Sequence, residues 1–365
     1  MQFIAKQADT IIIVICAILI VLGMAILASA SSHIGAAQFG DAHHFIRQQF
    51  IFGFGVGIVA FFVAMFIPLK FLKKYSFALL LMSIVLLILV FTPLGADFGT
   101  ANRWIDIAGI QFQPSEIIKL TFITYIAAWL TSKNKDRKKD FFEGLLPFMI
   151  ISGIIGALLL AQPSTSVVVL LMLSALIVYF AGGIKLSFIA IMGFVGALVL
   201  AIMIAITPYR AARVMSFLNP DIDTRGSAFH VNQSMMMIGS GGLTGVGYGE
   251  STFKIFFLPE PAGDSIFAII AEELGFIGSM FFIFLYFLLV FTGFMGSTKT
   301  RTDFGKLILI GFSSIIGIQT FMHIASVSGL TPMTGIPLPF ISYGGTALII
   351  FMAITGLMVN AFRNG

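Results

Sequence analysis

Apolar stretches long enough to cross a lipid bilayer recur from one end of this 365-residue chain to the other. The hydrocarbon core of a bilayer is about 30 Å thick, and an α-helix needs roughly 20 apolar residues to cross it. Mean hydropathy is +1.04, and only 10% of the residues are charged. We therefore expect an all-α, polytopic membrane protein that forms a single domain, residues 1–365. Ten spans are predicted, at residues 10–30, 50–67, 76–93, 114–132, 145–161, 166–181, 187–206, 265–292, 306–327 and 344–361.

The distribution of Lys and Arg predicts that both termini are cytoplasmic. Loops on the cytoplasmic side of a membrane carry an excess of these residues, and the dense cluster Lys133–Lys139 falls inside only when the N-terminus does. The net charge of +5 then reflects topology, and nucleic-acid binding is not expected. The external side receives the longest connections, residues 95–113 and 328–343 and a large loop, 207–264, between the seventh and eighth spans.

Glu116 and Lys119 lie three residues apart in the fourth span and share one face of the expected helix. One interpretation is a self-neutralising pair, which lowers an insertion cost of roughly 2.5–3.5 kcal/mol per charge. The other is a polar cavity wall in which Lys119 meets an anionic substrate. Arg103, in the preceding external loop, favours the anion site because it adds a second cation.

The stretch LPEPAGDSIF, Leu258–Phe267, places the carboxylate of Asp264 at the external mouth of the eighth span. An Asp at the start of a helix is most often an N-cap, but a carboxylate at the edge of an apolar span is also a candidate for chemistry. Deeper in the span, Glu272 and Glu273 are interpreted as structural acids paired with polar neighbours. His323 is interpreted as a hydrogen-bonded packing residue, because no His, Cys and Asp cluster has zinc-like spacing.

Two motifs in the 207–264 segment resemble nucleotide-binding motifs only superficially. Asp221 and Asp223 form a D-x-D, but Asn-Pro and Thr-Arg-Gly flank it, a composition typical of turns. The glycine-rich run Ile238–Gly249 fits neither the dinucleotide fingerprint nor the P-loop. Its glycines either let the backbone approach a lipid or sugar closely or permit a tight re-entrant turn.

Five motifs, in order along nearly the whole chain, resemble those of the SEDS family of bacterial cell-wall proteins, the relatives of FtsW, RodA and SpoVE. The PEP and IAEELGFIG segments are more similar to FtsW or SpoVE than to RodA. The motifs are NRWI…QPSEIIKL (Asn102–Leu120), SFLNPDIDTRG (Ser216–Gly226), NQSMMMIGSGGLTGVGYGES (Asn232–Ser251), FLPEPAGDSIFAIIAEELGFIG (Phe257–Gly278) and GIPLPFISYGG (Gly335–Gly345).

The resemblance implies a peptidoglycan glycosyltransferase that polymerises lipid II outside the cytoplasmic membrane during cell division or elongation, with Asp264 as general base. Inverting transfer needs a base for the acceptor hydroxyl and positive charge for the departing lipid pyrophosphate. The resemblance implies no definite cofactor and leaves open a divalent cation, Mg²⁺ or Mn²⁺, which can supply part of that charge. The family's substrate-binding positions fall on Arg103, Glu116, Lys119, Lys254, Ser342 and Tyr343.

The resemblance also implies a class B penicillin-binding protein transpeptidase as partner, together with other divisome or elongasome membrane proteins, and a location at the division septum. The chain departs from the family around its acid, where Ala262-Gly263 and Ser265 replace the common His-Thr and Phe. Ser164 stands where the family usually has an acid, so no role is expected of that position.

Two other functions remain open at this point. A lipid II flippase would also need a polar groove, but its polar groups are expected along a path near the midplane, whereas the acids and cations here gather externally. A non-catalytic scaffold for a penicillin-binding protein would have no need of Asp264.

Overall fold

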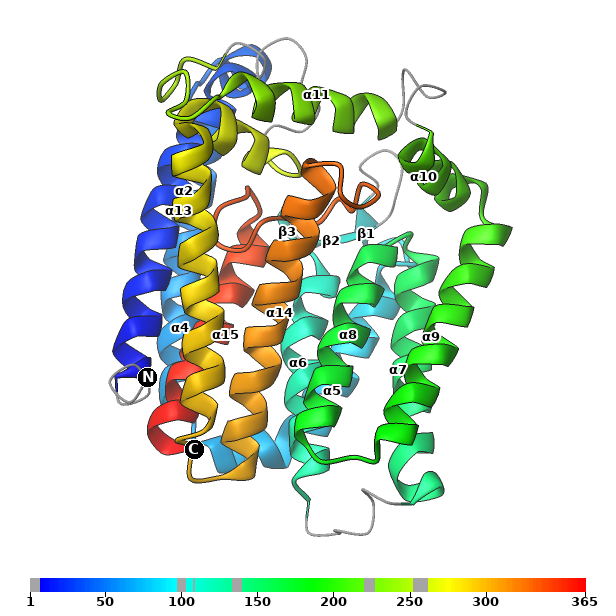
Figure 1. Ribbon diagram of the computed structural model, residues 1–365. Coiled ribbons are helices and arrows are strands. Elements are labelled where there is room, and N and C mark those ends of the chain that lie inside the picture. Colours follow the sequence, from blue (N-terminus) through cyan, green and yellow to red (C-terminus); the bar gives the residue numbers. More distant parts are fainter. Residues whose placement is uncertain (1–6, 97–102, 108, 133–139, 220–226, 252–261) are drawn as a thin grey trace.

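The computed structural model describes residues 7–96, 103–107, 109–132, 140–219, 227–251 and 262–365. Long helices run side by side in a bundle, and two shorter helices, α10 and α11, lie across one end of it (Figure 1). We call this the α10–α11 end. The described helices are α2 (Ala8–Phe39), α3 (His44–Gln48), α4 (Val56–Phe66), α5 (Leu69–Leu89), α6 (Pro114–Leu130), α7 (Leu146–Ala161), α8 (Thr165–Ala181), α9 (Leu186–Ile206), α10 (Pro208–Leu218), α11 (Ser227–Ser240), α13 (Ile266–Ser297), α14 (Asp303–Val327) and α15 (Gly345–Asn364).

The predicted multi-pass, helical architecture is confirmed. Within the described residues, eight helical stretches are long and apolar enough to cross a membrane. Two of these include π-helical turns, Gln49–Gly55 before α4 and Phe141–Leu145 before α7. The two remaining predicted runs coincide with α6 and α8, which have 17 residues each. Arg363 near the end of α15 donates to Asp9 in α2 over 2.7 Å, so the described chain starts and finishes at the same end of the bundle.

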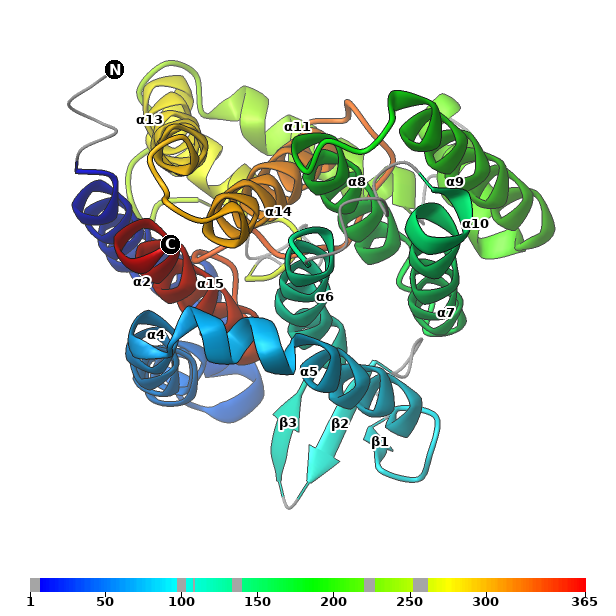
Figure 2. The same ribbon diagram turned by 90° about the horizontal axis from the view of Figure 1, so that it is seen from below.

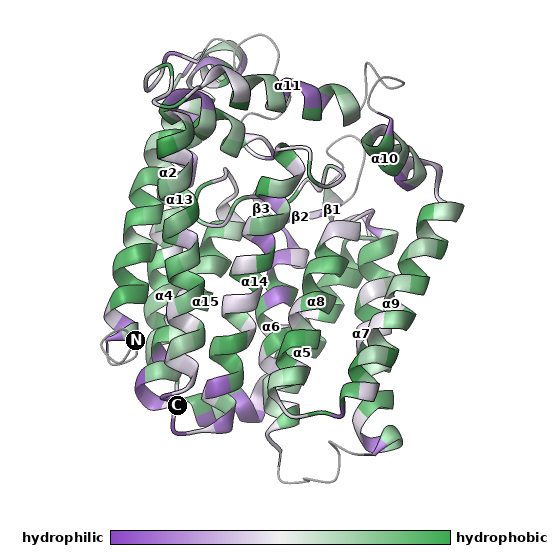
Figure 3. Cartoon of the chain, in the orientation of Figure 1, coloured by the Kyte–Doolittle hydropathy of each residue, from purple (hydrophilic) through white to green (hydrophobic). Residues whose placement is uncertain are grey.

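The outward faces of these helices are apolar, as a lipid-facing surface requires. In α9 only Met192 is buried, and Phe194 on the same helix is 71% exposed. Hydrophobic residues dominate the middle of the bundle and hydrophilic residues gather toward its ends (Figure 3). Seen from below, α14 and α6 lie inside the bundle and α9 lies at one edge (Figure 2).

A small antiparallel sheet interrupts the otherwise helical chain, in the stretch predicted as the loop 95–113. Its strands are β1 (Gly95–Ala96), β2 (Trp104–Ile107) and β3 (Ile110–Phe112), in the order β1-β2-β3. Ile105 pairs with Gly95 on one side and with Phe112 on the other. The sheet leads directly into α6, whose first residue is Pro114, and so fixes where α6 begins.

The helix α13 is broken at Gly275, which has φ +67° and ψ −166°. At about 1.5 Å per residue its 32 residues would measure about 48 Å, more than the hydrocarbon core. The glycine-rich run 238–249 packs against this break, where the amides of Val246 and Gly247 donate to the carbonyls of Glu272 and Glu273 over 2.9 and 3.1 Å. The glycines of this run therefore let the backbone approach another protein backbone closely, that of α13. A Cβ on Gly245 would lie 2.1 Å from the Glu273 carbonyl oxygen.

Candidate active site

Asp264 lies in the turn that precedes α13, at the α10–α11 end. The loop 335–343 bonds to this turn at two places. The Ser342 hydroxyl donates to the Gly263 carbonyl over 2.8 Å, and the Tyr343 amide donates to the Ala262 carbonyl over 2.8 Å. A Cβ built on Gly335 would lie 3.3 Å from Oδ2 of Asp264. The loop backbone therefore lies directly against the carboxylate.

The N-cap interpretation of Asp264 is wrong. Helix α13 begins at Ile266 and its N-cap position is Ser265, whose side chain makes no capping hydrogen bond. The chain enters the helix one residue later than the apolar pattern indicates, because the residues before Ile266 form a hydrogen-bonded turn against the 335–343 loop. The carboxylate of Asp264 is therefore not committed to the helix terminus.

Two arginines share the electrostatic environment of Asp264. Burial raises the pKa of the Asp264 carboxyl, and the guanidinium groups of Arg213 and Arg103 oppose that rise. A carboxylate with a raised pKa binds a proton more readily than a solvated one, which brings it closer to the strength that a general base needs near neutral pH. The two cations keep the ionised form accessible. Base and positive charge thus occur together at this turn.

Each arginine is fixed by backbone carbonyls of neighbouring elements. Arg213, on α10, donates through Nη1 to Met333 over 3.2 Å, and its guanidinium lies 4.7 Å from the centre of the Tyr209 ring. Arg103, just before β2, donates to Gln162 over 3.1 Å and to Pro163 over 2.7 Å. Burial lowers the pKa of Arg103, but an arginine remains protonated in proteins.

Arg213 is a candidate residue that the sequence analysis missed. Its neighbour Arg210, one turn away on α10, is engaged elsewhere: its guanidinium donates to Thr165 over 2.9 Å and to the Leu160 carbonyl over 2.7 Å. In the sequence both are external arginines of one short segment, and their spacing alone does not tell which of them faces Asp264.

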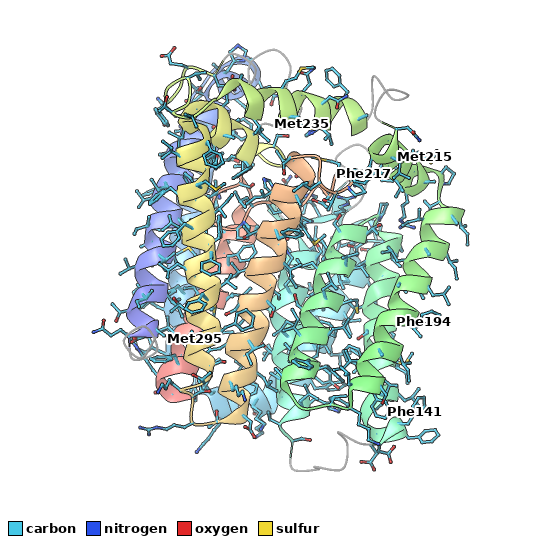
Figure 4. All side chains as sticks on the ribbon, viewed as in Figure 1. Phe141, Phe194, Met215, Phe217, Met235 and Met295 are labelled. Carbon is cyan, nitrogen blue, oxygen red and sulfur yellow. The ribbon has the colours of Figure 1, made fainter. Side chains whose placement is uncertain are left out.

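A cavity of about 180 Å³ adjoins Arg213 at the α10–α11 end. Most of its walls are apolar, and its polar lining residues are Arg213, Ser216 and Asn232. Phe217 and Met235, which contribute to the lining, lie on α10 and α11 (Figure 4). Such a pocket suits an amphiphilic ligand, with a cation for an anionic group. The full lining is Arg213, Ser216, Phe217, Ala228, Val231, Asn232, Met235, Gly329, Pro332 and Met333.

Glu116 and Lys119 are buried inside the bundle. They form an ion pair of 2.6 Å, and their side chains are 2% and 0% exposed. Lys119 also donates to Oε1 of Gln319 on α14 over 2.9 Å. This geometry agrees with the self-neutralising interpretation of the pair. Direct contact of Lys119 with an anionic substrate stays a prediction.

Ser342 and Tyr343 come close to Asp264 through their backbone and the Ser342 hydroxyl. The Tyr343 phenol points elsewhere, donating to Oε1 of Gln48 over 2.7 Å, and burial raises its pKa. A role for this phenol in the site stays a prediction. Lys254, Asp221 and Asp223 lie outside the described residues.

The interpretations of the remaining buried polar residues are confirmed. His323 bonds the Ile336 carbonyl through Nδ1 over 2.8 Å, as a packing residue. The hydroxyl of Ser29 donates to Glu273 over 2.5 Å, and that of Ser251 donates to Glu272, so both acids are structural.

Among the described residues, the groups around Asp264 do not fit a divalent cation. In the part of the chain that the structure describes, no three His, Cys, Asp or Glu side chains gather in a way that could hold a metal ion. Mg²⁺ and Mn²⁺ prefer several oxygen ligands, whereas the charged groups that act on Asp264 here are the guanidinium groups of Arg213 and Arg103.

Comparison with known proteins shows which family the chain is similar to. The sequence profile of the FtsW/RodA/SpoVE family, described as "Cell cycle protein", matches residues 9–365. A "Probable peptidoglycan glycosyltransferase FtsW" of Geobacter sp. (strain M18) is 35% identical, over 96% of each chain. "Stage V sporulation protein E" of Bacillus subtilis (strain 168) is 33% identical, over 97% of each chain.

Solved structures share the fold at 24% identity. A chain in a structure described as "Structural coordination of polymerization and crosslinking by a peptidoglycan synthase complex" superposes with a TM-score of 0.79, over 97% of both chains. The crystal structure of the rod shape determining protein RodA from Thermus thermophilus superposes with a TM-score of 0.69, over 97% of this chain and 96% of RodA. The chain therefore belongs to the FtsW/RodA/SpoVE family.

Proposed function

We propose that this protein is a peptidoglycan glycosyltransferase that polymerises lipid II on the outer face of the cytoplasmic membrane. The observation that carries the proposal is the partly buried carboxylate of Asp264, opposed by two arginines at the α10–α11 end. The names of the similar proteins support the same activity. In the proposed topology one membrane domain crosses the bilayer ten times, both termini are cytoplasmic, and α10, α11 and Asp264 lie outside.

In the proposed reaction, Asp264 accepts the proton of the acceptor sugar's 4-hydroxyl. The oxygen of that hydroxyl attacks the anomeric carbon of the donor sugar from the face opposite the phosphate. The new glycosidic bond forms as the bond from that carbon to the phosphate oxygen breaks, so the configuration inverts. The lipid pyrophosphate leaves with the bonding electrons, and Asp264 carries the proton. General-base catalysis of this kind is worth about 10²–10⁴-fold.

Arg213 and Arg103 supply the positive charge that the departing pyrophosphate needs. Fixed cations act without reorganising when negative charge develops, and both guanidinium groups are already held by backbone carbonyls. Arginine suits phosphate because its planar group donates several hydrogen bonds. Lys254, Ser342 and Tyr343 are proposed to line the same cleft.

A transpeptidase of the class B penicillin-binding proteins is the proposed partner, within the division or elongation machinery. The solved structure described as a peptidoglycan synthase complex, with its polymerisation and crosslinking, supports such a pairing. The similarity to proteins named FtsW supports a location at the division septum. A strand polymerised outside the membrane must be crosslinked there, so one complex joins the two reactions.

The testing experiment compares Asp264→Asn with wild type in vesicles that contain lipid II and the partner. The control is Asp41→Asn, which changes a half-buried acid paired with Arg47 over 3.2 Å. We expect the control to form glycan polymer at the wild-type rate and Asp264→Asn to form it at least about 10²-fold more slowly, while both bind the partner. Transfer of lipid II between leaflets by protein that never makes polymer would instead indicate a flippase. Protein that neither polymerises nor transports, yet still recruits the partner, would indicate a scaffold.

A further inference from the structure

A fully buried amide joins the Glu116–Lys119 ion pair to the loop that lies against Asp264. Gln319, on α14, is 0% exposed. Its Oε1 accepts from Lys119 over 2.9 Å, and its Nε2 donates to the Pro337 carbonyl over 2.8 Å. The orientation of the amide is unambiguous, because an ammonium can only donate and a carbonyl can only accept.

Pro337 lies in the middle of the loop whose two ends contact the Asp264 turn. Two residues earlier, Gly335 lies against the Asp264 carboxylate, and five residues later Ser342 bonds the Gly263 carbonyl. Because proline fixes its own φ, holding its carbonyl restrains the direction of the chain on both sides. Gln319 therefore anchors the loop at a point between its two contacts with the turn.

Helix packing alone gives no reason for these polar groups. The Phe351 ring lies 5.5 Å from Nζ of Lys119, and Phe122 on α6 and Phe312 on α14 are fully buried in the same bundle. Buried ion pairs are weak contributors to stability, and hydrophobic residues of similar volume often replace them without loss. A hydrophobic side chain of similar volume at 319 could not bind the Pro337 carbonyl.

We propose that Glu116, Lys119 and Gln319 are positioning residues that hold the 335–343 loop against Asp264. The ion pair fixes the Gln319 amide, the amide fixes Pro337, and the loop fixes the carboxylate and excludes water from it. The inference rests on the proposed function. It gives Lys119 a role that needs no contact with the substrate.

The test is Gln319→Met, a side chain of similar length that neither donates nor accepts a strong hydrogen bond and leaves Lys119 paired with Glu116. The matched control is Asn360→Leu, which removes another buried amide. Asn360 lies on α15, and its amide donates to the backbone carbonyls of Ala64 and Ile67 over 3.0 and 2.6 Å. Both variants lose amide-to-carbonyl bonds, so a merely structural role predicts the same kinetics for both.

The readouts are kcat, KM and the pH dependence of kcat for polymerisation. A reacting group displaced by about 1 Å can cost roughly 10²-fold in rate. We expect Gln319→Met to lower kcat at least about tenfold, with KM within about twofold of wild type and Asn360→Leu close to wild type in both. Released from the loop, Asp264 becomes more solvated and its raised pKa falls. The acid limb of the pH profile of kcat, where the rate rises as Asp264 loses its proton, therefore moves to lower pH.

The other groups that face the Asp264 turn are unchanged in this variant. They are Arg213 from α10, Arg103 from the segment before β2, and His230 from α11, whose ring lies 3.5 Å from the Ser265 hydroxyl. A shift of the acid limb in Gln319→Met therefore reports the loop rather than a change in these charges.

A second variant reaches the same loop without changing Gln319. Glu116→Gln with Lys119→Met removes both charges together, avoids an unpaired buried ion, and leaves the Gln319 amide without its Lys119 partner. We expect the same fall in kcat and the same shift of the acid limb. This double variant decides the matter if Gln319→Met does not fold.

Wild-type kcat and an unmoved acid limb in a folded variant overturn the positioning role. Equal losses in Gln319→Met and Asn360→Leu would do the same. Asp264→Asn, measured in parallel, separates this outcome from failure of the proposed function. If Asp264→Asn is inactive while Gln319→Met is normal, only the positioning role fails. If Asp264→Asn makes polymer at a rate within tenfold of wild type, the proposed function fails.

Discussion

Gly335 offers a direct way to move the Asp264 carboxylate without changing its charge. The substitution Gly335→Ala has two separable effects. The φ of Gly335, +63°, lies in the left-handed region, which costs an alanine about 1–2 kcal/mol of folding stability. The added Cβ also meets Oδ2 of Asp264 at 3.3 Å, a distance tight enough to push the carboxylate away by a few tenths of an ångström.

The expected loss of rate follows from that displacement. Since about 1 Å of misplacement costs roughly 10²-fold, a few tenths of an ångström should cost roughly fivefold to tenfold in kcat. Gly40→Ala is the matched control, because Gly40 has φ +67° and nothing within 4 Å of its Cβ position. Both variants should lose about 1–2 kcal/mol of stability, but only Gly335→Ala should lose activity.

The assay measures initial rates of glycan polymer formation by purified protein with its transpeptidase partner. Thermal denaturation of both variants in the same detergent checks that their stabilities match. Equal polymerisation rates for Gly335→Ala and Gly40→Ala would refute the reasoning, because the loop would then not determine where the carboxylate lies.

Further predictions concern the cations and the broken helix. Arg213→Gln removes a charge that lowers the pKa of Asp264, so that pKa should rise further and the acid limb of kcat should move to higher pH. The rate should thus fall more at pH 6 than at pH 8, whereas Arg210→Gln should leave the acid limb in place. An acid limb that does not move in Arg213→Gln would show that Arg213 does not influence the pKa of Asp264. Gly245→Ala places a Cβ 2.1 Å from the Glu273 carbonyl at φ +83°, and should cost at least about 3 kcal/mol of stability. Gly249→Ala, at φ +86° with open space around it, should cost only about 1–2 kcal/mol, and equal melting temperatures for the two would contradict the account.

The membrane-spanning helices were predictable because lipid imposes a simple requirement of length and apolarity. Local pattern could not locate the break in α13, because the backbone groups on either side of Gly275 bond to the 242–247 backbone, about 30 residues away in sequence. The start of α13 at Ile266 depends in the same way on contacts with the 335–343 loop, which is distant in sequence.

The candidate site was predictable in its acid and less so in its cations. Asp264 is conspicuous because acids are rare in such a chain, whereas Arg210 and Arg213 differ only in the neighbours that folding brings to them. Gln319 carries no charge and belongs to no motif, so only its contacts with Lys119 and Pro337 connect it to the site.

The central claim is that Asp264 acts as the general base of glycan polymerisation. The most direct test measures kcat for polymer formation by Asp264→Asn, an isosteric change that cannot accept the proton. We expect kcat to fall about 10²–10⁴-fold, with the protein folded and bound to its partner. A rate within tenfold of wild type would contradict it.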